Sequence, residues 1–346
     1  MTDRETRLKP VPFRLIMLVI FCCAAFCSAG TQWPTTDIPS IQKFPSDLRA
    51  GAGIAGKYKA DEGIEKDADV IFAENFEEGS FSAVKTRWES IQNEEIMSLS
   101  ADVPQDSSGK HSLLMRHVGG KGTGGHLYRR LLPGYKRLYF RFYVKFDPDC
   151  APIHHFFHVG GYNPPTPWPQ GGAGIRPTGD ERFTTGVEPY GDKWRWDFYS
   201  YWMGMRACPT GDCWGNDFIN DANLKAGRGK WICVELMMQM NDPAEESNGR
   251  QALWIDGEPH TKDGQIISGL GKGFPRGKWV WDSFIPQPDG VPFEGFRWRS
   301  TERLKLNFLW VLLYVTKAPP GHVSKVWFDD IVVAKKYIGP IATGQN

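Results

Sequence analysis

The sequence has no excess of charge of either sign. Its 346 residues include 41 lysines and arginines and 40 aspartates and glutamates, which give a formal net charge of +1. Nucleic acids and anionic membrane surfaces attract strongly basic proteins, so this balance argues against both as partners. The sequence also lacks an amphipathic helical pattern of three turns, which argues against a helical bundle.

Two common catalytic motifs are missing as well. The glycine-rich run at 119–125 has neither the Lys-Ser/Thr ending of a phosphate-binding loop nor a helical pattern behind it. The chain contains no Gly-x-Ser-x-Gly segment that would form the nucleophile elbow of a serine hydrolase. We therefore interpret the glycine run as a mobile loop beside a binding site.

Cysteine is scarce, with seven residues, three of which lie in the signal-like N-terminal segment. The other four are Cys150, Cys208, Cys213 and Cys233. Cys208 and Cys213 flank a short turn, and we predict that they form a disulfide in an exported protein. Cys150 and Cys233 either pair or remain free and buried. A zinc site at Cys208 and Cys213 is disfavoured, because no second Cys or His pair has zinc-like spacing.

The N-terminal segment 1–29 predicts a secretory signal peptide. A basic start precedes an apolar run at 15–29, which ends in small residues and is too short for a comfortable membrane span. The basic residues are Arg4, Arg7, Lys9 and Arg14. We therefore predict a secreted or periplasmic protein with no stable membrane span after cleavage. An uncleaved signal anchor is the alternative.

Short apolar–polar alternations separated by Gly and Pro turns dominate the rest of the chain. Aromatic residues make up 13% of the sequence, and they favour strands and the cores of β-sandwiches. The pattern predicts an all-β fold, a β-sandwich of the jelly-roll type. We place a linker or extended lead-in at 30–69, a single domain at 70–340 and a tail at 341–346, and we expect a monomer.

The clearest alternation lies at 193–202, which reads KWRWDFYSYW. In a strand, successive side chains face opposite sides. One face is almost entirely apolar, with Trp194, Trp196, Phe198, Ser200 and Trp202. The other carries groups that bind charge, transfer protons or stack on flat rings, namely Lys193, Arg195, Asp197, Tyr199 and Tyr201. The same division recurs at 137–146, with Tyr139 and Arg141 on the polar face, so both segments are predicted to line a groove.

Three histidines lie close together in the segment 153–159. Strict alternation places His155 on one face, and His154 and His158 on the other. Such a group has three interpretations: metal ligands, proton-transfer or carboxylate-binding groups, or structural residues with satisfied hydrogen bonds.

Acidic residues suggest a separate, structural site. Glu74 and Asp330 carry the hard oxygen ligands that a structural Ca²⁺ ion prefers. A solvated acidic turn is the alternative interpretation. No pattern in the sequence requires a cofactor.

Three segments carry a further signal: KWICVELMMQMN, NGRQALWIDGEPH and KVWFDDIVVAKKYIGP. They resemble the concanavalin A-like jelly roll of secreted polysaccharide lyases, above all the alginate and glucuronan lyases of families 14 and 20. The resemblance spans roughly Tyr139 to Pro340. It implies a β-sandwich with a concave saccharide-binding groove, and an acidic, uronate-containing polysaccharide as the partner.

The resemblance also implies roles for single residues. Lyases of these families carry an Arg and a Tyr-x-Tyr pair on one strand, which match Arg195, Tyr199 and Tyr201. His154 or His155 lies where the catalytic Lys of these families lies, so all five are candidate catalytic residues. Candidate substrate-binding residues are Arg141, Tyr139, Arg116, His158, Trp168, Asp197 and Glu235.

A lyase that acts on a uronate needs three groups. A cation or hydrogen-bond donor stabilises the charge at the carboxylate, a base removes the C5 proton, and an acid protonates the leaving oxygen. Arg195 and Arg141 suit the carboxylate, and Tyr199 or Tyr201 suits proton transfer. A non-catalytic carbohydrate-binding protein is the alternative. A glycoside hydrolase ranks lower, because the sequence has no Glu-x-Asp-x-Glu strand.

Overall fold

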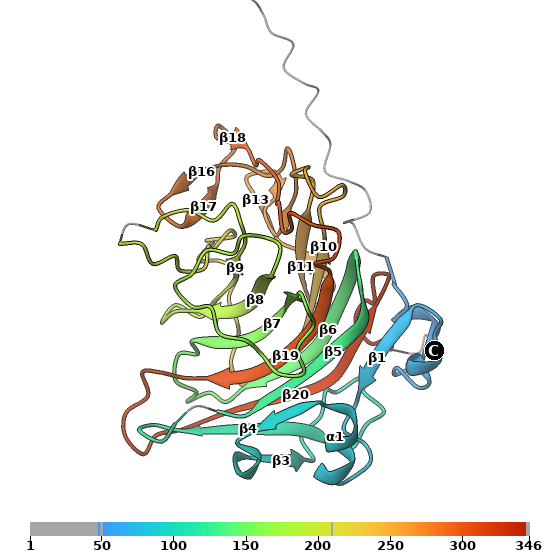
Figure 1. Ribbon diagram of the computed structural model, residues 1–346. Coiled ribbons are helices and arrows are strands. Elements are labelled where there is room, and N and C mark those ends of the chain that lie inside the picture. Colours follow the sequence, from blue (N-terminus) through green and yellow to red (C-terminus); the bar gives the residue numbers. More distant parts are fainter. Residues whose placement is uncertain (1–47, 49–50, 123, 209, 344–346) are drawn as a thin grey trace, which may run out of the picture. The chain divides into compact units, whose positions relative to one another are not determined.

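In the described part of the chain, two large antiparallel sheets pack face to face around an aromatic core. The computed structural model describes residues 48, 51–122, 124–208 and 210–343, which all belong to one unit at 41–346 (Figure 1). The predicted signal peptide at 1–29 lies outside the described residues. Within those ranges, no helix has the length and apolar character needed to cross a bilayer.

Nine strands of the described chain form the larger sheet. Its main path is β12 (Glu258–Pro259), β11 (Arg250–Ile255), β10 (Trp231–Gln239), β6 (Arg137–Phe146), β20 (Val323–Ala334), β4 (Ser112–Val118) and β3 (Met97–Ser100). Beside this path, β1 (Val70–Glu74) pairs with β20, and β15 (Gly269–Leu270) pairs with β11. The last strand, β20, therefore pairs with β1 and β4 from the first part of the chain and with β6 from its middle.

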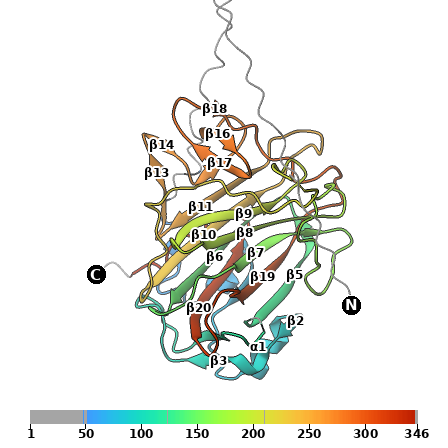
Figure 2. The ribbon, with the colours of Figure 1, turned by 90° about the vertical axis from the view of Figure 1, so that its left-hand side faces the viewer.

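Six further strands of the described ranges form the smaller sheet. Their order is β2 (Ser90–Gln92), β5 (His126–Tyr135), β19 (Leu306–Tyr314), β7 (His155–Tyr162), β8 (Arg182–Tyr190) and β9 (Arg195–Tyr201). Figures 1 and 2 show these strands side by side as a layer distinct from β6, β10 and β11. The predicted all-β sandwich is confirmed.

The remaining elements are short. They are η2 (Ala55–Lys57), η3 (Ile64–Lys66), α1 (Phe81–Arg87), η4 (Glu94–Ile96), β13 (Thr261–Lys262), β14 (Gln265–Ile266), β16 (Arg276–Val280), β17 (Ser283–Pro286) and β18 (Val291–Pro292). Ser80 precedes α1 and caps its N-terminus, because its hydroxyl accepts the N–H of Ala83. The strands β16, β17 and β18 form a small sheet, and the N–H of Phe284 in β17 donates to the carbonyl of Asp217.

Aromatic side chains from both sheets interlock in the core. On β6 the predicted apolar face, which runs from Leu138 to Phe146 at every second residue, is fully buried. Phe142 of β6 stacks on Phe157 of β7, with ring centroids 4.0 Å apart. Fully burying one such side chain contributes roughly 1.5–3 kcal/mol, so the paired faces hold the sandwich together.

The lead-in and the C-terminal segment cover the outer face of the larger sheet. The predicted linker or lead-in at 30–69 is described at residue 48 and from residue 51 onward, where it forms η2 and η3. One apolar cluster joins this cover to the sheet and includes Leu48, Ile54, Ile64, Tyr139 and Trp254. In the predicted tail, the N–H of Ile341 donates to the hydroxyl of Tyr143 at 2.9 Å. The described part of the lead-in is thus a packed layer and not a free linker.

This cover corrects the role predicted for Arg141. The side chain lies on β6 and is completely buried beneath the lead-in. Its guanidinium forms an ion pair with Asp61 and donates to the carbonyl of Asp330 at 3.0 Å. A buried charge requires such partners, and they leave Arg141 no access to a substrate.

Glu235, on the adjacent strand β10, is enclosed in the same way. Its two carboxylate oxygens accept the N–H groups of Ile338 and Gly339, each at 2.8 Å. Burial raises the pKa of Glu235 to about 7, although these hydrogen bonds and Arg141 oppose the shift. The predicted substrate-binding role is therefore corrected: Glu235 anchors the C-terminal segment.

The raised pKa of Glu235 predicts a pH-dependent stability. Between about pH 4.5 and 7 the folded state binds more protons than the unfolded state, so the free energy of unfolding falls as the pH rises through this range. The contribution of this residue is at most about 3 kcal/mol. Denaturant titrations at pH 5 and pH 7.5 measure this difference in the free energy of unfolding.

Glu235→Gln is the matched variant. It loses one hydrogen-bond acceptor, so it is expected to be less stable than the original protein at pH 5. It has no carboxyl group to ionise, and its stability is expected to fall less between the two pH values. An equal fall in both proteins would contradict the assignment.

Candidate functional site

A groove lies on the face of the smaller sheet that is turned away from the core. It consists of two adjoining hollows of about 670 and 180 Å³, which share His155, Ala173, Tyr199 and Tyr201. Strands β7, β8, β9 and β19 supply residues to its lining, together with a loop at 170–173. The groove is thus built on regular strands, which hold side chains more rigidly than loops do.

Tyr199 and Tyr201 project from β9 into this groove. The alternation predicted for this strand is confirmed, because Trp196 and Phe198 are fully buried in the core. The two phenolic oxygens lie 3.4 Å apart. Burial and, next, the hydrogen bond with Tyr201 raise the pKa of Tyr199, so this residue keeps its proton at neutral pH.

A glycine allows the wall of the groove to approach Tyr199. A Cβ atom on Gly215 would lie 2.7 Å from atoms of the Tyr199 ring, which is closer than a side chain can come. Only glycine fits here, and Gly215 thereby fixes the position of the ring from one side. The centroid of the His155 ring lies 5.2 Å from the Tyr199 ring on another side.

His155 and His158 share a carboxylate oxygen at the floor of the groove. Nδ1 of His155 lies 2.8 Å from Oε1 of Glu188, and Nε2 of His158 lies 3.0 Å from the same oxygen. Burial acts to raise the pKa of Glu188, but the two imidazoles outweigh it and lower the pKa to about 2. Glu188 is therefore a carboxylate, and burial lowers the pKa of His158.

The two histidines face the same side because alternation fails on β7. Phe156 and Phe157 follow one another in sequence, yet both are fully buried in the core. The pairing of β19 with β7 has a register irregularity at this point, and such irregularities re-aim side chains. The prediction that His155 and His158 lie on opposite faces is therefore wrong.

Several lining residues were not predicted from the sequence. Glu188 lies on β8, whose buried Phe183, Thr185 and Val187 alternate with the groove-facing positions. This period of two was a usable signal that the sequence analysis missed. The other unpredicted lining residues include Tyr314, Lys317, Trp310 and Trp214.

His154 lies at the outer end of the groove, beside His155. The two ring centroids are 4.2 Å apart, and the N–H of His154 donates to the carbonyl of Tyr314 at 2.6 Å. Burial and the neighbouring His155 lower the pKa of His154. The structure thus brings together four of the five candidate catalytic residues: both tyrosines and both of these histidines.

The fifth candidate, Arg195, is held by acidic partners. Its guanidinium lies 2.9 Å from Asp217 and 3.5 Å from Asp197, and it covers the ring of Tyr190. Asp197 is fully buried, and its carboxylate accepts backbone N–H groups at 218–220. The substrate-binding role predicted for Asp197 is therefore corrected, because its oxygens anchor this segment. Through its contacts with Asp197 and Asp217, Arg195 helps to hold the same segment in place.

Three more predicted substrate-binding residues lie outside the groove. Tyr139 is buried on the outer face of the larger sheet, beneath the lead-in. Arg116 also lies in the larger sheet, where β4 pairs it with Lys325 of β20. Trp168 is 54% exposed in the loop between β7 and β8 and does not contribute to the lining of either hollow. Of the predicted substrate-binding residues, His158 reaches the groove.

The residues predicted for calcium lie along another hollow of the described chain. Both oxygens of Glu74 accept hydrogen bonds from Arg87, at 2.6 and 2.8 Å, and Trp88 donates to one of them at 3.0 Å. Glu74 therefore holds the end of α1, which corrects its predicted role as a metal ligand. Asp330 keeps a buried oxygen without a partner, and its calcium role stays a prediction.

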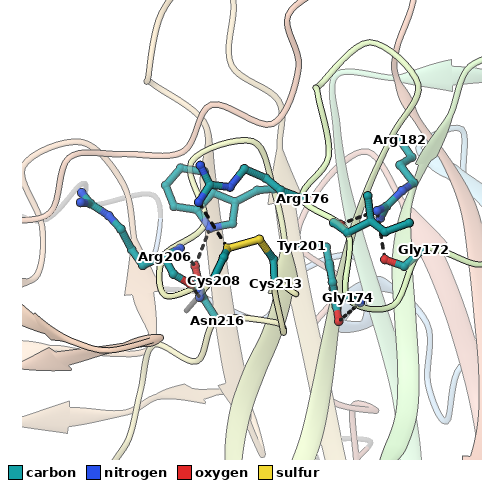
Figure 3. The surroundings of a disulfide bond; sticks show 11 residues. Gly172, Gly174, Arg176, Arg182, Tyr201, Arg206, Cys208, Cys213 and Asn216 are labelled. Atoms are coloured by element: carbon teal, nitrogen blue, oxygen red, sulfur yellow. Dashed lines mark hydrogen bonds between the residues drawn. A yellow bond between two sulfur atoms is a disulfide. The ribbon is translucent and has the colours of Figure 1, made fainter. Parts of the chain in front are cut away.

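The predicted disulfide between Cys208 and Cys213 is present, and it braces the loop over Tyr201 (Figure 3). The N–H of Cys213 donates to the carbonyl of Gly174 at 2.8 Å, and the N–H of Gly174 donates to the hydroxyl of Tyr201 at 3.5 Å. Arg182 donates to carbonyls of the same loop at 3.0 and 2.5 Å. Cys150 and Cys233 are free and buried.

Comparisons with known proteins agree with the fold. An alginate lyase from a Chlorella virus matches with a TM-score of 0.52 at 12% identity, over 77% of this chain and 100% of its own. The alginate lyase Aly36B matches with a TM-score of 0.47 at 13% identity, over 80% of this chain and 96% of its own. An endo-β-1,4-glucuronan lyase from the fungus Trichoderma reesei has a TM-score of 0.41 at 14% identity, with 77% and 96% covered.

These likenesses concern the fold alone, and the first of them confirms that the chain has the jelly roll of an alginate lyase. No protein-family model matches the sequence, and neither does any curated protein. The chemistry of the groove must therefore be argued from its own residues.

Removing the disulfide is expected to loosen the loop over Tyr201. In the double variant Cys208→Ser, Cys213→Ser, amide hydrogens at 170–176 should exchange faster, because the Cys213–Gly174 hydrogen bond loses its tether. The loop that the disulfide closes is short, so the expected loss of global stability is about 2 kcal/mol. Hydrogen exchange with mass spectrometry measures the change, and peptides of β10 are the internal control. Unchanged exchange at 170–176 would contradict the bracing role.

Proposed function

We propose that this protein is a secreted polysaccharide lyase that cleaves a uronate-containing polysaccharide by β-elimination in the groove. The observation that carries the proposal is the convergence of two phenolic hydroxyls, on Tyr199 and Tyr201, with the His155–Glu188 pair. The matching fold supports it, since the neighbours of this fold include an alginate lyase.

The two tyrosines suit the two proton transfers. Tyr199 keeps its proton and is the candidate acid for the leaving oxygen. Tyr201 is the candidate base, because the N–H of Gly174 points at its oxygen and the guanidinium of Arg182 lies 5.8 Å from its ring.

The proposed elimination uses one base and one acid. The Tyr201 phenolate takes the C5 proton, the C5–H electron pair forms the C4=C5 double bond, and the C4–O bond breaks. Tyr199 gives its proton to the leaving oxygen, which becomes the new hydroxyl of the released chain. A proton then passes from the Tyr201 hydroxyl to the Tyr199 oxygen, 3.4 Å away, and this transfer restores the starting state.

His155 suits the carboxylate of the sugar. Its Nδ1 lies 2.8 Å from Oε1 of Glu188, which orients the ring and leaves Nε2 to face the carboxylate. In this proposal His155 takes the place of the Lys of the related lyases. His154 assists from the outer end of the groove. Arg195 is not a carboxylate clamp, because Asp217 and Asp197 already bind it.

Export is part of the proposal. A polysaccharide of this kind lies outside the cytoplasm, which agrees with the signal peptide predicted at 1–29. The Cys208–Cys213 disulfide also favours an oxidising compartment. We propose that the domain at 70–340 acts as a monomer.

A carbohydrate-binding protein without catalysis is the second candidate. It is favoured by the side chain of Trp214, which is 51% exposed at the edge of the groove and offers a stacking surface for sugar rings. A glycoside hydrolase is less well supported. It needs two carboxyl groups on either side of the scissile bond, whereas Glu188 is bound to both histidines and the other lining carboxylates, Asp192 and Asp282, lie outside the strands.

The test is a panel of alginate, glucuronan, other uronate polymers and neutral glycans. A lyase produces the ultraviolet absorbance of the unsaturated uronate, and Tyr199→Phe is expected to lower the rate by about 100-fold or more, because the acid is removed. The control is Tyr337→Phe, which removes a hydroxyl on the outer side of the larger sheet. Circular dichroism checks that both variants fold.

Other outcomes reject the proposal. New reducing ends without ultraviolet absorbance indicate a hydrolase. Retention on a polysaccharide gel with no product of either kind indicates a binding protein. A Tyr199→Phe protein as active as Tyr337→Phe excludes the assigned acid.

A further inference from the structure

We infer that His155, His158 and Glu188 bind a divalent transition-metal ion, zinc in the first place, at the floor of the groove. The site itself depends only on the geometry of these three residues. The role given to the ion below rests on the proposed function.

The donor atoms are already gathered. Nδ1 of His155, Nε2 of His158 and a carboxylate oxygen of Glu188 all lie within 4.8 Å of one another. Donors around a tetrahedral zinc ion, with bonds of about 2.0–2.1 Å, are separated by about 3.3 Å. The present separations from Glu188 are 2.8 and 3.0 Å, so small outward shifts would admit the ion.

The kind of donor also suits zinc. Two imidazoles and a carboxylate form a ligand set typical of catalytic zinc, in which a fourth position stays open for water or substrate. His155 and Glu188 line the larger hollow, so the open position faces the groove. His158 lines the smaller hollow, where it packs edge-on against Trp310 with ring centroids 5.6 Å apart.

The backbone makes room for this arrangement. Gly186 lies opposite His158 on β8, and a Cβ atom there would come within 2.6 and 2.8 Å of two atoms of the imidazole ring. A larger residue would displace His158 from Glu188. Rigid strands and a glycine thus hold the three donors on the same face of the sheet.

The charge of the groove gives the ion a role. The lining carries three carboxylates, Glu188, Asp192 and Asp282, against the side chains of Lys317 and Arg182. Such a lining repels a polyuronate. A divalent ion bound to Glu188 would make the net charge of this lining positive.

Under the proposed function, the ion then contacts the carboxylate of the uronate and stabilises the charge that develops when the C5 proton leaves. It supplies the positive charge that the Lys supplies in the related lyases. Proton transfer remains with Tyr199 and Tyr201. His155 acts in this case as a ligand and not as a direct donor to the sugar.

Metal binding is tested on the full secreted chain without a polyhistidine tag. The protein is stripped with a chelator, and Zn²⁺ is titrated by calorimetry. Co²⁺ is added in parallel, because its visible spectrum reports nitrogen and oxygen ligands. We expect one ion per chain, and an affinity about 100-fold weaker or worse in His155→Ala and in Glu188→Gln. The control is His322→Ala, a histidine that precedes β20 in the larger sheet.

Two results would overturn the site: no stoichiometric binding by the original protein, or equal binding by all three variants. Glu188 is buried, so Glu188→Gln is judged only if circular dichroism shows a folded protein. His155 is partly exposed, and His155→Ala decides the outcome if Glu188→Gln does not fold.

The inference and the proposed function fail in different ways. Binding is measured without a glycan, so stoichiometric zinc with no cleavage of any polymer supports the site and rejects the lyase. Cleavage that is unaffected by chelation, in a protein that binds no zinc, supports the lyase and rejects the site. His155 then remains the donor to the carboxylate.

Discussion

The stacking of Phe142 on Phe157 represents the constraint on which the rest of the structure depends. Each strand of the smaller sheet must turn an apolar face toward β6 and its neighbours, because the buried aromatic area is the main source of stability. The opposite faces of β7, β8 and β9 are thereby left for polar and phenolic groups. The groove is a consequence of this division, since its floor consists of the positions that the core does not use.

Buried charges are the second constraint on this structure. Three carboxylates, two in the smaller sheet and one in the larger, are almost completely buried, and each has a different set of partners. Asp197 accepts backbone N–H groups, Glu235 holds the C-terminal segment, and Glu188 joins two imidazoles. Desolvation forces every buried charge to find partners, and the partners decide whether it is structural or available for chemistry. Glu188 alone of the three lines the groove.

Alternation with a period of two predicted much of the fold. It identified the buried faces of 137–146 and 193–202, and it placed Tyr199 and Tyr201 away from the core. It failed where the strand is irregular, at Phe156 and Phe157, because a local change of register is not written in the apolar pattern. It also failed for Arg141 and Glu235, which follow the pattern but belong to the other sheet.

The local pattern of residues therefore specifies which side chains of a strand face the core, because alternation is a local property of the extended backbone. The sheet that a strand joins, and the segment that covers its other face, depend on the packing of the whole domain. The lead-in over Arg141 and the shared oxygen of Glu188 both depend on contacts between segments far apart in the chain. Such contacts are set by the packing of the whole domain, and no local pattern encodes them.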